Sequence, residues 1–218
     1  MNTLREAVNP FDGLTSLREA LILANSDPDE SEITFDDTVF VPGQDNVIRL
    51  VDGTLVFATD LSIDGDVNGD GLPDVTVTGD ELGDDITTPD NVGATVTDAC
   101  NNTNTADNTR VISIDRGVDA SINGLTITGG VTTDTNSYGN GAGIRAEYSS
   151  SLFLSNSSIS GNVAGNEGGG LSNNGVATAL NVAVTGNTAY RSGGGITTFG
   201  ANGSDDNGAF FGVNLTIS

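Results

Sequence analysis

The sequence predicts an all-β fold, a right-handed parallel β-helix closed at its N-terminal end by one amphipathic helix. Three observations support this prediction: an internal repeat of about 25 residues, short apolar-polar alternations separated by glycine and asparagine, and one helical pattern near the start of the chain. A repeat unit of short strands and tight bends cannot bury its apolar side chains alone, so we expect successive units, or rungs, to stack. The 218 residues are enough for a single domain, which we assign to residues 1–218.

The helical pattern belongs to an N-terminal cap, which we place at residues 1–30. In "GLTSLREALILAN", Ser16 and Glu19 have the spacing of a capping box, and the residues at i, i+3, i+4 and i+7 form an apolar face: Leu17, Ala20, Leu21 and Ala24. We therefore expect a helix over about residues 15–25. A stack of parallel strands ends in an open edge that would recruit another chain, and a helix laid over the first rung prevents this.

Residues 31–120 are predicted to form less regular, acidic early rungs. We expect strands around residues 33–35, 48–50, 61–63, 75–77 and 111–114, and a long polar loop between about residues 84 and 110. That loop contains Cys100, the only cysteine, so the chain has no internal disulfide. We interpret Cys100 as an isolated residue; the alternative is a bridge to a cysteine outside this chain.

Residues 121–218 carry the regular rungs. The stretch "NSSISGNVAGNEGGGL" from Asn156 aligns with "NVAVTGNTAYRSGGGI" from Asn181 at a spacing of 25. Stacking then predicts two aliphatic ladders, one of Ile127, Ile159, Val184 and Ile217 and one of Ile144, Leu171 and Ile196. It also predicts a ladder of asparagines at a bend, because asparagine tolerates a left-handed backbone and its amide can bond the next rung: Asn156, Asn181 and Asn214. We interpret these asparagines, and the glycine triplets at Gly168 and Gly193, as structural.

The strongly negative net charge makes negatively charged binding partners unfavourable. The formal net charge is −23, all seven basic residues are arginine, and residues 1–120 hold 25 of the 30 acidic residues. Nucleic acid and anionic membranes are poor partners for such a surface, whereas many short carboxylates suit calcium loops or a saline exterior. No apolar run is long enough to span a bilayer, and residues 1–10 lack the apolar core of a signal peptide. If the protein is exported, its signal has been removed or lies upstream.

The acidic stretch "DGDVNGDGLPD" at residues 64–74 predicts a calcium site. Counted from Asp66, the pattern alternates ligand-type residues and places glycine at position 6, and the predicted oxygen ligands are Asp66, Asn68, Asp70, Asp74 and the backbone carbonyl of Leu72. The spacing resembles the calcium loop of integrin-type FG-GAP repeats. An EF-hand register fails because Val75 stands where the bidentate glutamate should be. The alternative is a solvated acidic turn between two strands.

The N-terminal pattern also resembles a known family. "DGLTSLREALILAN" followed by "ITFD" resembles the CSLREA motif of bacterial exported β-helix proteins, with the leading cysteine absent, and the "TITGG", "SISGN" and "VTGN" stretches are similar to polymorphic outer-membrane-protein repeats. The resemblance implies a secreted or cell-surface location, often within a longer protein, and no particular activity. Since the chain stops partway through a rung, we expect it to be a piece of a longer protein, with further repeats or end-to-end contacts at its C-terminal end.

Two classes of function follow. The first is a non-enzymatic surface module, adhesin-like or structural and stabilised by Ca2+; with no His, no Lys and one Cys, several catalytic routes are closed. The second is a carbohydrate-active enzyme, a polysaccharide lyase or glycosidase, or a glycan-binding module, because pectate-lyase-like enzymes share this architecture. The candidate catalytic residues of such an enzyme are Asp115, Arg116 and Asp119, near Arg110. Salt bridges at the surface are a simpler explanation of these charged residues. The net charge also disfavours acidic polysaccharides as substrates.

Loops offer possible contacts to partners. The stretches 136–140 and 203–211 carry aromatic residues that suit a glycan or a cell-surface protein, although such aromatics more often cover the base of their own loop: Tyr138, Phe210 and Phe211.

Overall fold

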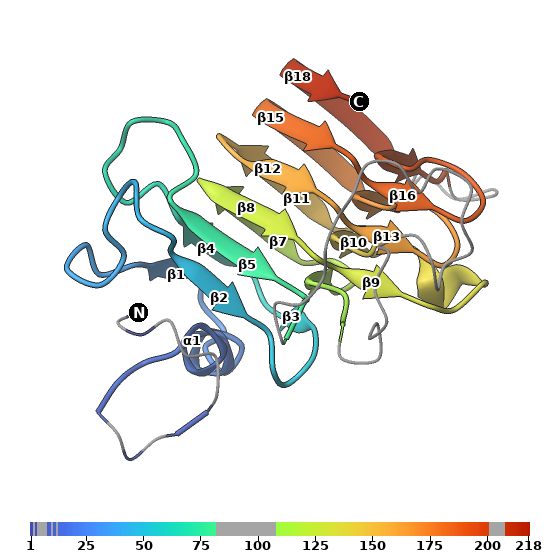
Figure 1. Ribbon diagram of the computed structural model, residues 1–218. Helices are drawn as coiled ribbons and strands as arrows, with labels where there is room; N and C mark the ends of the chain where they lie inside the picture. The colour runs from blue at the N-terminus through green and yellow to red at the C-terminus, as the bar shows by residue number, and fades with distance from the viewer. Residues whose placement is uncertain (2, 4–7, 10, 12, 82–107, 201–207) are drawn as a thin grey trace.

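The computed structural model describes residues 1, 3, 8, 9, 11, 13–81, 108–200 and 208–218. These residues form three sheets of parallel strands and one α-helix, α1 (Leu17–Ala24). Figure 1 shows the strands stacked from the blue N-terminal strands to β18 at the C-terminal end. The prediction of an all-β protein with parallel strands is confirmed in these ranges. Cys100 and most of the expected loop at residues 84–110 lie outside them.

The strands are short, and most lie where the sequence predicts them. The first six are β1 (Ser31–Thr34), β2 (Val47–Arg49), β3 (Leu55–Phe57), β4 (Leu61–Asp64), β5 (Val75–Thr78) and β6 (Ile112–Ile114). The next six are β7 (Asp119–Asn123), β8 (Leu125–Thr128), β9 (Val131–Thr132), β10 (Ile144–Ala146), β11 (Ser151–Ser155) and β12 (Ser158–Ser160). The last six are β13 (Val163–Ala164), β14 (Leu171–Asn173), β15 (Val176–Thr185), β16 (Thr188–Ala189), β17 (Ile196–Thr198) and β18 (Ala209–Ile217).

The chain visits the three sheets in a repeating order. Sheet A has ten strands in the order β1-β4-β7-β11-β15-β12-β8-β5-β2, with β18 paired to β15; sheet B runs β17-β14-β10-β6-β3, and sheet C runs β16-β13-β9. From β7 onward the chain passes through A, then C, then B, before it returns to A. We call one such pass a circuit. Each circuit lays its strands parallel to those of the previous circuit.

Matching residues of successive circuits pair with one another. Ile159 pairs with both Ile127 and Val184, and Val184 pairs with Ile217. On sheet B, Leu171 pairs with Ile144 and Ile196. Both predicted aliphatic ladders are therefore present, and their inner members are fully buried. Ile217 is 55% exposed because β18 ends the stack.

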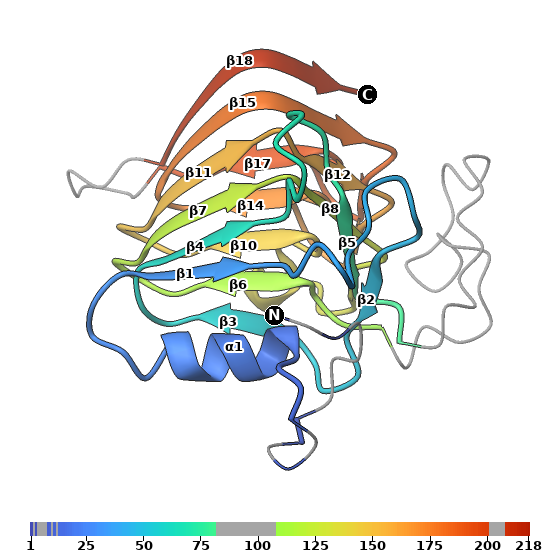
Figure 2. The ribbon, with the colours of Figure 1, turned by 90° about the vertical axis from the view of Figure 1, so that its left-hand side faces the viewer.

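Helix α1 covers the other end of the stack. Its N-cap Ser16 accepts a hydrogen bond from the Glu19 amide, and the Glu19 carboxylate accepts one from the Ser16 amide, which completes the predicted capping box. The buried face of Leu17, Leu21 and Ala24 contacts β1 and β3. Figure 2 shows α1 beside β3, at the end opposite β18. Within the described ranges, no helix has the length and apolar character needed to cross a membrane.

The predicted asparagine ladder is present where sheet A bends. Asn156, Asn181 and Asn214 all have positive φ, between 49° and 56°. Asn181 Nδ2 donates to Asn156 Oδ1 at 3.1 Å, and Asn214 Nδ2 donates to Asn181 Oδ1 at 2.8 Å. The ladder continues toward the N-terminus, because Asn156 Nδ2 donates to Asn123 Oδ1 and Asn123 Nδ2 donates to Asp64 Oδ1. Side-chain amides thus link five successive positions along sheet A, from Asp64 on β4 to Asn214 on β18.

Candidate functional site

The predicted calcium loop emerges at the N-terminal end of this ladder. It connects β4 to β5 and begins at Asp64, whose carboxylate holds both Asn123 Nδ2 and the Asp66 amide. The loop folds back over the bend, so that Gly71 lies next to the Asn156 side chain. The loop is therefore anchored on the most regular polar feature of the fold.

The acidic side chains of the loop turn inward and hold backbone amides. Asp66 accepts bonds from the amides of Asp70 and Gly71 at 3.0 and 2.9 Å, and Asp74 Oδ2 accepts from those of Val67 and Asn68 at 2.9 and 3.3 Å. Gly69 and Gly71 have φ of 73° and 78°, which the tight turn requires. The turn is closed by its own carboxylates.

The chemistry of this donor set fits a hard cation. The side chains of Asp66, Asn68, Asp70 and Asp74 bring oxygen ligands to one turn, and an ionised carboxylate that accepts one or two amides keeps lone pairs for another partner. The Leu72 amide donates to Asp70 Oδ1 at 2.9 Å, so the Leu72 backbone is part of the same turn. In the described ranges, however, no three acidic, histidine or cysteine side chains converge on one point in the manner of a metal site. Calcium binding therefore stays a prediction.

In the described ranges, no hydrogen bond or ion pair joins the side chains of the candidate catalytic residues to one another. Arg116 lies over the Tyr148 ring, 5.5 Å from its centroid, instead of forming the expected ion pair with a described carboxylate. The Asp119 amide donates to Asp60 Oδ1 at 2.8 Å, and the Asp115 amide donates to the Phe57 carbonyl. Arg110 lies beyond the opposite end of β6. These contacts join neighbouring strands and turns.

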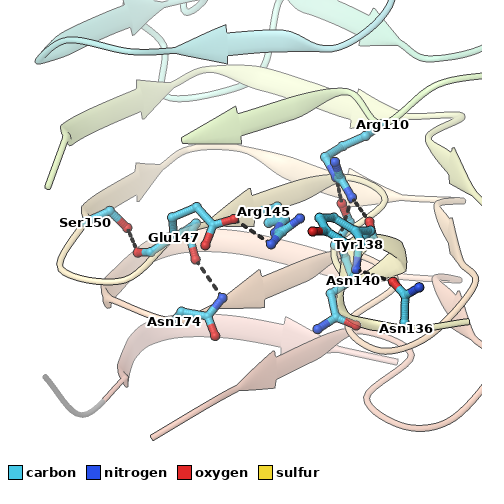
Figure 3. Close-up of polar contacts among 10 residues, drawn as sticks. Arg110, Asn136, Tyr138, Asn140, Arg145, Glu147, Ser150 and Asn174 are labelled. Atoms are coloured by element: carbon cyan, nitrogen blue, oxygen red, sulfur yellow. Dashed lines mark hydrogen bonds and ion pairs between the residues drawn. The ribbon is translucent and has the colours of Figure 1, made fainter. Parts of the chain in front are cut away.

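A second polar cluster, which we did not predict, lies on the outer face of sheet B. We call it the sheet B cluster and define it as Arg110, Tyr138, Arg145, Glu147 and Ser172. Arg145 Nη2 contacts Glu147 Oε1 at 2.6 Å, and Arg110 Nε donates to the Gly141 carbonyl at 2.8 Å. Figure 3 shows Arg145 between Glu147 and the segment that contains Tyr138. The alternation "IRAE" could have suggested that Arg145 and Glu147 face outward together, but not that Arg110 joins them.

Burial and neighbouring charges both change the pKa of Arg110. Its guanidinium also donates to the carbonyls of Tyr138 and Asn140. Burial, and secondarily the charge of Arg145, lower the pKa of Arg110 to about 10, while Glu147 and Asp134 oppose this shift. Arg110 therefore stays charged at neutral pH, and the nearby Arg145 is paired with Glu147.

The three aromatic residues predicted as possible contacts to a partner differ in their exposure. Phe210 lies on β18 and not in the expected loop, and it packs against the hydrophobic core. Tyr138 and Phe211 are 69% and 59% exposed, on the 3-10 turn Ser137–Gly139 and on β18. Only the latter two are available to a partner.

No protein-family model, curated protein or solved structure matches this chain.

Proposed function

We propose that the chain is a right-handed parallel β-helix that acts as a non-enzymatic module outside a bacterial cell, secreted or held at the outer surface, and is stabilised by calcium. The register of the strands carries this proposal. Matching apolar residues and matching asparagines pair between circuits throughout the second half of the chain, which is the pattern expected of a solenoid. The resemblance to CSLREA-type exported proteins supports the location.

Calcium has a structural role in this proposal. The loop joins two strands of sheet A and lies against the asparagine ladder, so a cation held by Asp66, Asn68, Asp70, Asp74 and the Leu72 carbonyl would fix this connection. Neutralising three carboxylates in one turn would also reduce their mutual repulsion. We favour a structural module over an enzyme because the described contacts of Asp115, Arg116 and Asp119 are accounted for by strand and turn packing.

A rigid frame of this kind presents its loops and its last strand to partners. The exposed Tyr138 and Phe211 are suitable contacts for a glycan or a cell-surface protein. The outer edge of β18 is suitable for further repeats or for end-to-end contacts, because β18 pairs with β15 on one side only among the described strands.

Thermal unfolding in calcium and in chelator tests the calcium role. We expect calcium at about 100 times its Kd to raise the melting temperature of the wild type by roughly 5–10 °C. Asp70→Asn should remove most of this increase, because it keeps the hydrogen-bond acceptor but loses the charge. The matched control is Asp52→Ala, in another exposed acidic turn, which should behave like the wild type. Equal melting temperatures with and without calcium would contradict the proposal.

A further inference from the structure

Six asparagines in the chain are followed directly by a glycine, and four of these pairs lie in the described ranges: Asn68–Gly69, Asn123–Gly124, Asn140–Gly141 and Asn174–Gly175. In such a pair the backbone nitrogen of the glycine can attack the side-chain amide of the asparagine, because glycine has no side chain that hinders the approach. The attack requires an asparagine that water reaches and a glycine that is free to move. The four pairs differ in both respects.

Three of the four pairs are held inside the fold. Asn140 and Asn174 are 6% and 7% exposed, and Asn123 is a half-buried member of the asparagine ladder. In each pair the glycine amide donates a hydrogen bond: Gly124 to the Ser155 carbonyl at 3.1 Å, Gly141 to the Glu167 carbonyl at 3.0 Å, and Gly175 to Asn173 Oδ1 at 3.1 Å. Backbone atoms of other residues also fill the space beside each of these glycines, where a Cβ would stand. These glycines have no room to move.

The pair Asn68–Gly69 is open in both respects. Both residues are exposed, in the loop between β4 and β5. The Gly69 nitrogen lies 3.4 Å from the Asp66 carbonyl oxygen, the longest of the four glycine amide bonds, and apart from its two chain neighbours nothing lies within 4 Å of the position that a Gly69 Cβ would take. Asn68 Oδ1 accepts a bond from the Asp70 amide, and Asn68 Nδ2 donates to the Asp70 carboxylate, within the same exposed turn. Water therefore reaches both of the groups that react.

We propose that Asn68 is a site of spontaneous deamidation. The Gly69 nitrogen, after losing its proton to base in the solvent, attacks Asn68 Cγ and closes a succinimide ring; the bond from Cγ to Nδ2 breaks, and ammonia leaves with a proton from water. Water then opens the ring at one of its two carbonyl carbons. Opening at Cγ gives aspartate, and opening at the main-chain carbonyl gives isoaspartate, whose backbone runs through Cβ and Cγ. In sum, one amide and one water become one carboxylate and one ammonium ion.

The two products change the loop in opposite ways. Aspartate adds a carboxylate at the third position of the predicted calcium loop, beside those of Asp66, Asp70 and Asp74, and a higher ligand charge strengthens calcium binding. Isoaspartate adds a methylene group to the backbone between Asp66 and Asp70, which disturbs the spacing of the ligands and weakens binding.

Calcium should in turn control the reaction, an inference that rests on the proposed function. An ion that holds Asn68 Oδ1 and the surrounding turn opposes the rotation of the side chain that ring closure needs. The reaction would then proceed mainly in molecules without calcium. Deamidation at Asn68 would therefore record, in a covalent form, the time that a molecule has spent without the ion.

Ageing the folded 218-residue protein in chelator at mildly alkaline pH tests the site, with digestion by pepsin in acid and mass spectrometry as the readout. We expect the acid products to form at least several-fold faster at Asn68 than at Asn123, Asn140 and Asn174. Those three are free to react mainly in unfolded molecules, about one in a thousand or fewer. The matched control is the same protein aged in guanidinium chloride, where the four pairs should react at similar rates. Equal rates at the four pairs in the folded protein, or no reaction at Asn68, would overturn the proposal.

A parallel sample aged in calcium separates the modification from the role of calcium. We expect the rate at Asn68 to fall several-fold in calcium, while the rates in guanidinium chloride do not change. A rate at Asn68 that is equal in calcium and in chelator would overturn the control by calcium but not the modification. If calcium also fails to raise the melting temperature, the proposed function is wrong, whereas the modification has been measured without calcium. Asn68→Asp, which carries the aspartate product from the start, should bind calcium several-fold more tightly than the wild type, and weaker binding would overturn the effect assigned to that product.

Discussion

At the scale of single residues, the asparagine ladder combines two physical requirements at each position. Asn181 has a φ of 56°, a conformation that costs an ordinary L-residue about 1–2 kcal/mol. Its amide also bonds both neighbours in the ladder, Asn156 and Asn214. Asparagine meets both requirements because its short polar side chain tolerates the left-handed region and carries a donor and an acceptor.

Two substitutions at Asn181 separate these contributions. Asn181→Gly keeps the backbone conformation and loses both amide bonds, so we expect a loss of about 1 kcal/mol in the free energy of unfolding. Asn181→Ala adds the backbone strain and should lose about 2 kcal/mol. Urea unfolding measures both values, and Thr178→Ala on the same strand is the control, with a change below about 0.5 kcal/mol. Equal losses in the two Asn181 variants would show that the backbone conformation contributes nothing.

At the scale of elements, helix α1 depends on its capping box more than on its length of eight residues. Short isolated helices are marginal in water, so caps and packing must stabilise this one. Ser16 and Glu19 satisfy amides at the first turn, and the apolar face packs on β1 and β3. Loss of the cap would expose the ends of the first strands.

Substitution and pH both test the capping box. Ser16→Ala should reduce the free energy of unfolding by about 1 kcal/mol, and Ser151→Ala, at an exposed serine of β11, is the control with little change. The hydrogen bond from the Ser16 amide, mainly, lowers the pKa of Glu19. A lowered pKa in the folded state stabilises the protein above the pKa of the unfolded chain, and this stabilisation is lost as the pH falls through the folded pKa. Glu19→Gln should therefore be less stable than the wild type at neutral pH and approach it in acid. A difference that persists unchanged in acid would contradict this role for the carboxylate.

The internal repeat allows the later strands and their pairing to be predicted from the sequence. Strand β3 and the sheet B cluster lie outside this pattern of repeats, and the sequence does not predict them. A fixed spacing places equivalent residues in register, so the pairing of Ile159 with Val184 follows from the sequence. Strand β3 has no repeat partner and only three residues between turn signals, and it was not predicted. The sheet B cluster depends on the segment around Tyr138 contacting Arg110 across 28 residues, and no local pattern encodes that contact. The calcium loop is local in sequence, and its turn was recognisable for that reason.

At the scale of the whole molecule, the two ends of the stack differ in cover and in charge. Helix α1 covers β1 and β3 at one end, within the strongly acidic part of the chain. At the other end, β18 offers a nine-residue edge, and on residues 176–200 and 208–218 Arg191 is the one charged side chain. Phe211 and Val213 on this strand are 59% and 64% exposed. Because β18 itself carries no charged side chain, two copies of the chain can approach along this strand with little repulsion between the two edges.

The edge of β18 should make the 218-residue chain associate with itself. An exposed, uncharged and apolar strand edge is a template for pairing with another strand, and a lysine on such an edge opposes pairing by its charge. We expect the sedimentation coefficient of the wild type to rise with protein concentration and that of Val213→Lys to remain close to the monomer value. Val176→Lys is the control, because Val176 is 45% exposed but its strand, β15, is paired on both sides by β11 and β18. If both lysine variants abolish association equally, the apolar outer face and not the strand edge holds the copies together. A wild-type chain that stays monomeric at all concentrations would refute association through β18.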